Sequence, residues 1–389
     1  MTHDPDALAR ALKHLDGLEA TMIDFCRRMV EINSYSENVA GNDAVAALLA
    51  EALDWPSLTP TTIPGQKRAA HRVWRTRASG PPILLIGHHD TVFPPGHFEG
   101  WVSDGARAVG PGALDMKGGL AVIWGALAAL EKEGLLGQLP LAVMSVADEE
   151  VGSTESRPHL TRLAQGAACA LVFESGRRAD AIVTSRRGTG TLELSFLGRA
   201  AHAGNAHADG RNAVWAMARF IDTAQGLTDY SRGTTVNVGL ASGGTAANTV
   251  PEAATCKVDV RFEHSAEATA LLAALREAAE RAAASVGARV VISGGANRLP
   301  MDRTEASLAL YREYAEHARA SGLGFAENPT VGGGSDANTV AALGVPVIDG
   351  LGPRGDGFHT PSEWVDLTSF KPKAAALLRF LCGRLGRSG

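Results

Sequence analysis

The sequence predicts a three-layer α/β domain that is interrupted by a smaller α+β domain. Continuously apolar runs alternate with helical segments in the outer parts of the chain, which is typical of a mainly parallel sheet covered on both faces. From about residue 178 to residue 297 the apolar residues instead alternate with polar ones, which is typical of a sheet with one exposed face. We therefore expect one domain formed by residues 1–177 and 298–389, with residues 178–297 inserted as a second domain.

The elements of the outer domain follow from the spacing of its apolar residues. Strands with both faces buried are predicted at residues 81–87, 140–147, 168–173 and 345–350. Helical spacing predicts helices at residues 6–32, 42–53 and 117–134, the second ended by Trp55-Pro56 and the third by a glycine.

The inserted segment has the order β-α-β-β-α-β, a split βαβ (ferredoxin-like) unit. Its alternating strands are predicted at residues 191–198, 234–244, 254–262 and 288–295, and its helices at residues 212–223 and 267–287.

Composition excludes several classes of function. The 389 residues carry a net charge of −5 and 45% hydrophobic residues, a soluble balance without the basic face of a nucleic-acid-binding protein. No apolar run reaches the roughly 18 residues that a membrane span requires, and the N-terminus lacks the apolar core of a signal peptide. We expect a cytoplasmic protein with no nucleic-acid or membrane partner. The four cysteines are far apart in the sequence and are predicted to be reduced thiols in the core.

Ionisable residues follow the predicted buried strands at the points where the strands end. His88, the pair Glu149-Glu150, Glu174 and His359 each come after one such strand, and Asp115 precedes a helix. Each residue alone would more often be a turn residue or a helix cap. The paired acids are less ordinary, because neighbouring carboxylates repel unless a cation or proton lies between them. Because the carboxyl ends of parallel strands meet at one sheet edge, the set predicts a mixed nitrogen and oxygen site that suits Zn²⁺.

Several motifs together resemble the M20 metallopeptidase family, and within it the glutamate carboxypeptidase branch. The resemblance extends from about residue 20 to the C-terminus. The motifs are GHHDTV, GPGALDMKGG, ADEEVGS, FESG, GRAAHAG, ANTVPEA, VDVRF, GGGSDAN and GPRGDGFHT.

This resemblance implies two Zn²⁺ ions per chain. It assigns His88 and Glu174 to one ion, Glu150 and His359 to the other, and Asp115 to both as a bridge.

The resemblance also implies roles for residues beside the metal ligands. Asp90 would orient His88, and Glu149 would be the general acid/base. His89 is expected to point away from the ions, because neighbouring residues of a strand face opposite sides.

In the inserted domain, the resemblance implies a lid that also forms a homodimer. His202 is expected to reach the active site of the partner subunit, and Asn248 and Arg261 to contact a substrate carboxylate. The strand pattern alone would place Arg261 on a solvated face. Gly333, within a run of three glycines, is expected to present its backbone N–H to substrate. For Arg186 and Arg187, binding of an acidic side chain and simple solvent exposure remain equally open.

These features predict zinc-dependent hydrolysis of an amide bond that releases a C-terminal amino acid, most often glutamate, from a peptide or N-acyl conjugate. The substrate would be a small molecule or short peptide with a free carboxylate. The alternative is a deacylase of N-acyl amino acids, of the deacetylase or desuccinylase type, with the same two-zinc site. An aminopeptidase is disfavoured, because Arg261 suits a carboxylate rather than an ammonium group. A non-catalytic binding protein of the same fold is the remaining hypothesis from another class.

Overall fold

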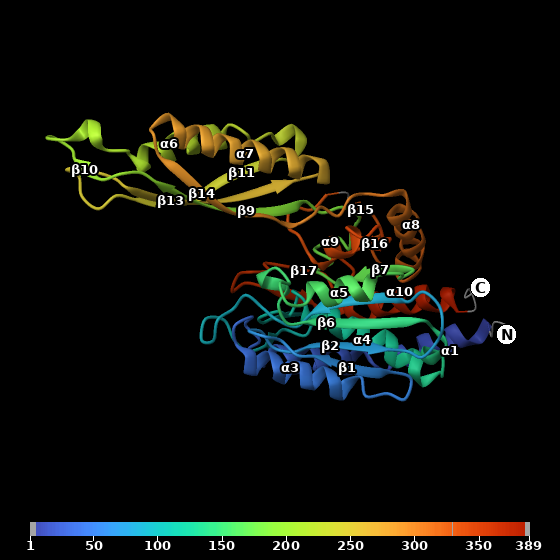
Figure 1. The fold of residues 1–389 in the computed structure, drawn as a ribbon. Coiled ribbons are helices and arrows are strands. Elements are labelled where there is room, and N and C mark those ends of the chain that lie inside the picture. The colour runs from blue at the N-terminus through green and yellow to red at the C-terminus, as the bar shows by residue number, and fades with distance from the viewer. Residues whose placement is uncertain (1–4, 329, 386–389) are drawn as a thin grey trace. The chain divides into compact units, whose positions relative to one another are not determined.

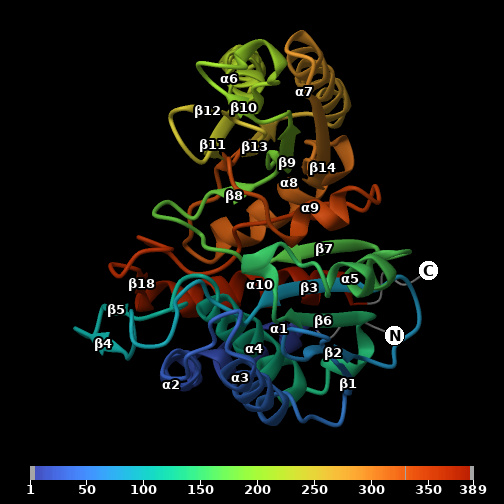
Figure 2. The same ribbon diagram turned by 60° about the vertical axis from the view of Figure 1, so that its left-hand side comes forward.

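The computed structural model describes residues 5–328 and 330–385, which form two compact units (Figure 1, Figure 2). The first unit comprises the chain up to Thr184, Arg303–Thr330, and the chain from Ser335 onward. The second unit comprises Ser185–Asp302 and Val331–Gly334.

The boundaries of the second unit differ from the predicted residues 178–297, and the whole glycine run belongs to it. Val331 N donates to Ser185 O at 3.1 Å, and Arg187 N donates to Val331 O at 2.9 Å. These backbone bonds join Val331 to the start of the second unit, although it is distant in sequence. Sequence patterns do not reveal such a pairing, because the segment is too short to carry a period.

The first unit is built on a mainly parallel sheet with the strand order β1-β2-β6-β3-β7-β16. Strand β3 is parallel to β6 and β7, and β16 is parallel to β7, whereas β2 pairs antiparallel with β6 and with β1. The parallel strands are those that the sequence predicted. The edge strand β1 and its neighbour β2 were missed, because their sequences TPTTI and HRVWR lack a continuous apolar run. The bounds are β1 (Thr59–Ile63), β2 (His71–Arg75), β3 (Ile83–His88), β6 (Leu141–Val146), β7 (Cys169–Val172) and β16 (Val347–Ile348).

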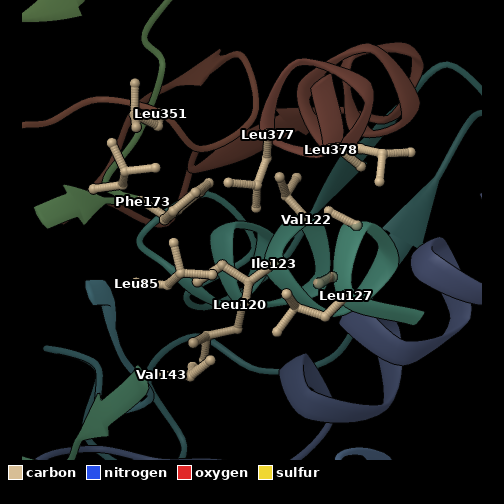
Figure 3. Close-up of a cluster of buried hydrophobic side chains, with 14 of the residues drawn as sticks. Leu85, Leu120, Val122, Ile123, Leu127, Val143, Phe173, Leu351, Leu377 and Leu378 are labelled. Atoms are coloured by element: carbon tan, nitrogen blue, oxygen red, sulfur yellow. The ribbon is translucent and has the colours of Figure 1, made fainter. Parts of the chain in front are cut away.

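Helices cover both faces of this sheet. On one face α4 packs against the strands, with Leu120 and Ile123 beside Leu85 and Val143 (Figure 3). These side chains are at most 3% exposed, and burying each contributes about 1.5–3 kcal/mol relative to an exposed position. Helices α1, α2 and α10 pack around α4, while α9 packs against β7 and α5, and α8 against β16. The bounds are α1 (Pro5–Asp16), α2 (Glu19–Val30), α3 (Val39–Ala52), α4 (Lys117–Lys132), α5 (Arg157–Ala164), α8 (Glu305–Ala320), α9 (Asp336–Ala341) and α10 (Phe370–Arg384).

The helix predicted over residues 6–32 is in fact two helices. Gly17 N donates to His14 O and Leu18 N donates to Leu15 O, both at 3.0 Å, and these bonds close α1 before α2 begins. The periodicity of apolar residues continues across the break, which is why the sequence did not reveal it.

Two small sheets complete the first unit. The antiparallel order β17-β18-β5-β4 lies beside the segments that lead to Asp115 and His359, and β15 pairs parallel with β8. The bounds are β4 (Val102–Ser103), β5 (Arg107–Val109), β8 (Ile182–Val183), β15 (Glu327–Asn328), β17 (Gly355–Asp356) and β18 (Trp364–Asp366).

The second unit has the predicted chain order, here β9-α6-β11-β13-α7-β14. Its antiparallel sheet has the strand order β11-β13-β9-β14, and α6 and α7 cover one face. Along β13 buried and less buried residues alternate strictly, which confirms a sheet with one covered face. The bounds are β9 (Gly188–Leu197), β10 (Ala201–His202), α6 (Ala213–Gln225), β11 (Thr235–Gly243), β12 (Thr249–Val250), β13 (Ala253–Phe262), α7 (Ser265–Ser285) and β14 (Arg289–Arg298).

Two predictions from composition can be compared with the described residues. Each cysteine is a buried free thiol, at positions 26, 169, 256 and 382. Within residues 5–328 and 330–385, no helix is both long enough and apolar enough to cross a bilayer.

Candidate metal centre

Five ionisable side chains meet at the carboxyl edge of the main sheet, all within the first unit. His88 ends β3, Glu150 lies in a short 3-10 helix (Glu149–Val151) after β6, and Glu174 follows β7. Asp115 lies just before α4, and His359 lies in the loop between β17 and β18. The topology thus brings together residues that are up to 271 positions apart in the numbering, from 88 to 359.

The five side chains form two groups that share Asp115. His88 Nε2 is 3.3 Å from Asp115 Oδ1 and 3.7 Å from Glu174 Oε1. His359 Nε2 is 3.3 Å from Asp115 Oδ2 and 3.1 Å from Glu150 Oε2. Each oxygen of Asp115 therefore faces one imidazole and one further carboxylate.

The spacing of these atoms is suitable for a cation. One ligand atom each from His88, Asp115 and Glu150 lies within 4.8 Å of the other two. The side chain of His88 is 1% exposed and that of Glu150 is 7% exposed, whereas His359 is half exposed. One side of the cluster is thus sealed by protein and the other is open to solvent.

The electrostatics of the cluster show an excess of buried negative charge. Burial and the neighbouring Asp115 raise the pKa of Glu174 to about 7. Hydrogen bonds to Asp115 and Glu150 raise the pKa of His359 to about 11. Burial alone would lower the pKa of His88, but Glu174, Asp115 and Asp90 together raise it well above its usual value. The donor set of two imidazole nitrogens and three carboxylates fits zinc-type ions, whose positive charge would offset that of the carboxylates.

Asp90 links the end of β3 to the turn that carries the two glutamates. Its side chain is fully buried, and it accepts hydrogen bonds from Glu149 N at 3.1 Å and Glu150 N at 3.2 Å. His88 Nδ1 lies 3.1 Å from the Asp90 carbonyl oxygen. In this contact the Nδ1–H of His88 donates to the Asp90 carbonyl. The proton of the neutral ring is therefore on Nδ1, and Nε2 can act as a metal ligand. Ser36, which the sequence did not single out, donates its hydroxyl to Asp90 Oδ2 at 2.7 Å.

His89 lies away from the five-residue cluster. It is fully buried, and its Nδ1 is 2.8 Å from Ser145 Oγ on β6. Burial lowers the pKa of His89 to about 3, so the ring is neutral at physiological pH.

A second residue that sequence reasoning missed is Glu363. It is completely buried and contacts the backbone of the segment that ends in Asp115. The sequence held little signal for it, since a single acid before the short strand Trp364–Asp366 resembles an ordinary surface residue.

In the second unit, His202 and Asn248 lie side by side. His202 pairs with Thr249 across β10 and β12, and Ala203 N donates to Asn248 O at 3.0 Å. Both residues are exposed. His202 Nδ1 accepts bonds from two backbone N–H groups, each at 3.1 Å, so in the neutral ring the proton is on Nε2.

Arg261 lies on the uncovered face of β13, as the strand pattern predicted. Its guanidinium is paired with Asp259, with Nε 2.9 Å from Oδ1 and Nη2 3.2 Å from Oδ2. The side chain of Arg261 remains 35% exposed. The arginine is thus paired with a neighbour on its own strand and stays partly open to solvent.

The glycine run is held by Arg186. The Arg186 side chain is buried, and its Nη1 donates to Gly333 O at 2.9 Å. The side chain is therefore not solvent-exposed, and it fixes a backbone carbonyl next to the N–H groups of the run.

Comparisons with known proteins identify the family of this chain. The sequence model of peptidase family M20/M25/M40 matches residues 84–382, a span that includes all five clustered residues. The chain belongs to the M20 peptidase family. M20 proteins of this kind are metal-dependent hydrolases. The family match therefore favours an enzyme over a non-catalytic binding protein of the same fold.

Two curated M20 relatives differ in the reactions that their names describe. Carboxypeptidase G2 of Pseudomonas sp. (strain RS-16) is 29% identical over 295 residues, 75% of this chain and 71% of that protein. A succinyl-diaminopimelate desuccinylase of Methylobacterium radiotolerans is 29% identical over 345 residues, 82% of this chain and 85% of that protein.

The fold has counterparts among solved structures. The YXEP protein of Bacillus subtilis, described as a dinuclear metal-binding peptidase of the M20 family, superposes with a TM-score of 0.71 at 16% identity. The match covers 95% of this chain and 99% of that structure.

Proposed function

We propose that this M20 hydrolase is a two-zinc carboxypeptidase that releases C-terminal glutamate from a peptide or an N-acyl conjugate. The observation that carries the proposal is the division of the site around Asp115. One carboxylate oxygen faces His88 and Glu174, and the other faces His359 and Glu150.

In this proposal each half of the cluster holds one zinc ion. His88 and Glu174 would ligate the first ion, Glu150 and His359 the second, and Asp115 both. Two such ions lower the pKa of a shared water to about 7 and polarise the scissile carbonyl.

Glu149 is proposed as the group that moves the proton. It takes a proton from the attacking water and delivers it to the leaving nitrogen of the amide. Its main-chain N–H is held by Asp90, which also accepts the N–H of Glu150. A single buried carboxylate therefore fixes the turn that carries both the base and a ligand, so the distance between them is set before substrate arrives.

The second unit is proposed to supply the substrate contacts. Arg261, with Asn248, binds the α-carboxylate beside the scissile bond, since a planar guanidinium can form two parallel hydrogen bonds to a carboxylate. Gly333 presents its N–H to the substrate. His202, with its proton on Nε2, acts in a homodimer at the site of the partner subunit and stabilises the oxyanion there.

A deacylase that acts on N-acyl amino acids is the second candidate. It is favoured by the desuccinylase relative, of which this chain covers 85%. The carboxypeptidase is favoured by the match to carboxypeptidase G2 and by Arg261, whose fork is paired with Asp259. Both candidates share the metal centre and differ in which half of the substrate is recognised.

A substrate panel separates the two candidates. Purified enzyme is assayed with one acyl group on glutamate, aspartate, a neutral amino acid and ornithine, and then with several acyl groups on glutamate. The carboxypeptidase predicts that kcat/KM depends mainly on the amino acid and is highest for glutamate. A kcat/KM that follows the acyl group and is insensitive to the amino acid would establish the deacylase instead.

A further inference from the structure

Glu363 is a buried carboxylate that lies between two segments of the metal centre. It follows His359 by one tight turn and leads directly into β18. Strand β18 pairs antiparallel with β5, with Trp364 opposite Val109. This register brings Glu363 against the segment that runs from the end of β5 to Asp115.

The Glu363 side chain accepts hydrogen bonds from three main-chain N–H groups of that segment. Its Oε1 accepts from Leu114 N at 2.8 Å and from Asp115 N at 3.0 Å, and its Oε2 accepts from Gly112 N at 3.2 Å. The backbone from which the Asp115 side chain projects is therefore fixed by one carboxylate.

On the other side, Glu363 closes the turn that contains His359. Glu363 N donates to Thr360 O and Thr360 N donates to Gly357 O, both at 3.1 Å. Thr360 Oγ1 also donates to Gly357 O at 2.7 Å. Within this turn His359 has a φ of 63°, a left-handed conformation that a side-chain-bearing residue rarely adopts. The imidazole is thus held in a short, internally bonded loop whose last residue is Glu363.

We propose that Glu363 is a positioning residue that couples Asp115 to His359 and so sets the affinity for the ion between Asp115, Glu150 and His359. The inference rests on the proposed two-zinc site. Two ligands of that ion are connected to Glu363. The Glu363 carboxylate bonds to the backbone N–H of Asp115, and His359 lies in the loop that ends at Glu363. The other ion, with His88 and Glu174, depends on Glu363 only through Asp115. Loss of the carboxylate loosens Asp115, which both ions share, and also releases the His359 turn from the Asp115 segment. The ion between Asp115, Glu150 and His359 should therefore weaken more than the ion held by His88 and Glu174.

The test is stepwise zinc binding to the full chain, measured by competition with a chromogenic chelator, for wild type and Glu363→Gln. Glutamine keeps the shape, but its NH₂ group must face a backbone N–H, so at least one of the three bonds is lost. We expect the first zinc to bind almost as in wild type and the second to bind about 10–100-fold more weakly, as is usual when a group behind a ligand is changed.

A thermal melt of each protein, with and without zinc, separates positioning from general stabilisation. Positioning predicts a metal-free melting temperature close to that of wild type and a smaller rise on adding zinc. The matched control is Asp104→Asn, because Asp104 also accepts two backbone N–H bonds, from Ala106 and Arg107, but in the hairpin between β4 and β5. It should bind both zincs as wild type does. If Glu363→Gln does not fold, Glu363→Asp is used, which keeps the charge but shortens the reach.

The role of Glu363 and the proposed two-zinc function are contradicted by different outcomes. Equal weakening of both zincs, unchanged binding of both, or a lower metal-free melting temperature with an unchanged zinc-induced rise would overturn the role of Glu363. A wild-type protein that binds a single zinc would overturn the two-zinc function itself, and the inference with it.

Discussion

The metal-site edge of the first unit and the uncovered face of β13 in the second unit accommodate ionisable residues in opposite ways. At the edge of the main sheet the first unit buries Asp90 and Glu363 completely, together with most of the metal cluster. In the second unit, the charged residues of β13 lie on the uncovered face, where Lys257 pairs with Glu193 and Arg261 with Asp259.

The difference reflects the free-energy cost of burying a charge and the ability of an exposed charge to bind a ligand. A buried carboxylate needs hydrogen bonds or cations to offset its lost hydration, so a cluster of them is stable only where such partners are built in. A solvated arginine costs little and can exchange its partner for a ligand. We therefore expect changes in the first unit to alter metal content and catalysis, and changes in the second to alter substrate recognition at constant metal content.

The largest effect is expected for Glu149→Gln. The substitution keeps the shape but removes the proton acceptor, and general acid–base catalysis contributes about 10²–10⁴ in rate. kcat should fall by at least that factor, while elemental analysis should find the metal content of wild type. A variant that keeps more than about a tenth of the wild-type kcat would exclude Glu149 as the base.

Asp115→Asn tests the sharing of one carboxylate between two ions. The neutral amide has a single oxygen, so it cannot offer one oxygen to each half of the cluster. We expect the zinc content to fall from near two ions per chain, further than in variants of His88 or Glu174, and chelation of wild type to abolish activity. Full metal content and activity in Asp115→Asn would contradict the two-metal site.

His202→Ala tests whether the second unit acts on the partner subunit. Loss of one oxyanion donor lowers kcat by about 10²–10³, with no change in bound metal. Mixing this variant with Glu149→Gln should restore part of the activity, because each heterodimer then contains one intact site. Light scattering that shows a monomer, or no recovery after verified subunit exchange, would argue against a role in trans.

Arg261→Ala should have a smaller and purely substrate-linked effect. Hydrogen bonds to charged groups are worth about 1.5–3 kcal/mol, so kcat/KM should fall by roughly tenfold to a hundredfold or more. The loss should be large for free-acid substrates and small for the matching carboxamides. Asp259→Asn is the companion variant, because it leaves the arginine in place but removes its carboxylate partner. An equal loss on acids and carboxamides would make Arg261 a packing residue.

The smallest effect is a dependence of zinc affinity on pH. Burial and Asp115 raise the pKa of Glu174 to about 7 in the metal-free protein, so below that pH zinc must displace a proton from this carboxyl group. Affinity should rise with pH through 7. Release of the Glu174 proton alone contributes about tenfold between pH 6 and pH 8, and the raised pKa values of His88 and His359 make the total rise steeper. Chelator competition at the two pH values measures the ratio for wild type and for Glu174→Gln. A ratio that is no larger in wild type than in Glu174→Gln would mean that Glu174 carries no such linkage.

The sequence by itself determined the parallel strands, the class of the inserted unit and the cluster of acids and histidines. Buried strands of a parallel sheet are continuously apolar, so the polar residue at which each run stops marks the sheet edge. For that reason His88, Glu150, Glu174 and His359 were predicted to meet at one sheet edge. Asp115 was added as a residue before a helix, and the family resemblance implied that all five are metal ligands.

Only the tertiary structure decided how those residues are held. The break between α1 and α2, the antiparallel strands β1 and β2, and the pairing of Val331 with Ser185 have no periodic signal. Ser36 and Glu363 are single polar residues in unremarkable surroundings, and their importance comes from which backbone N–H groups and carboxylates lie opposite them. Partners so distant in sequence are set by the packing of the whole unit, and no local pattern of residue types encodes them.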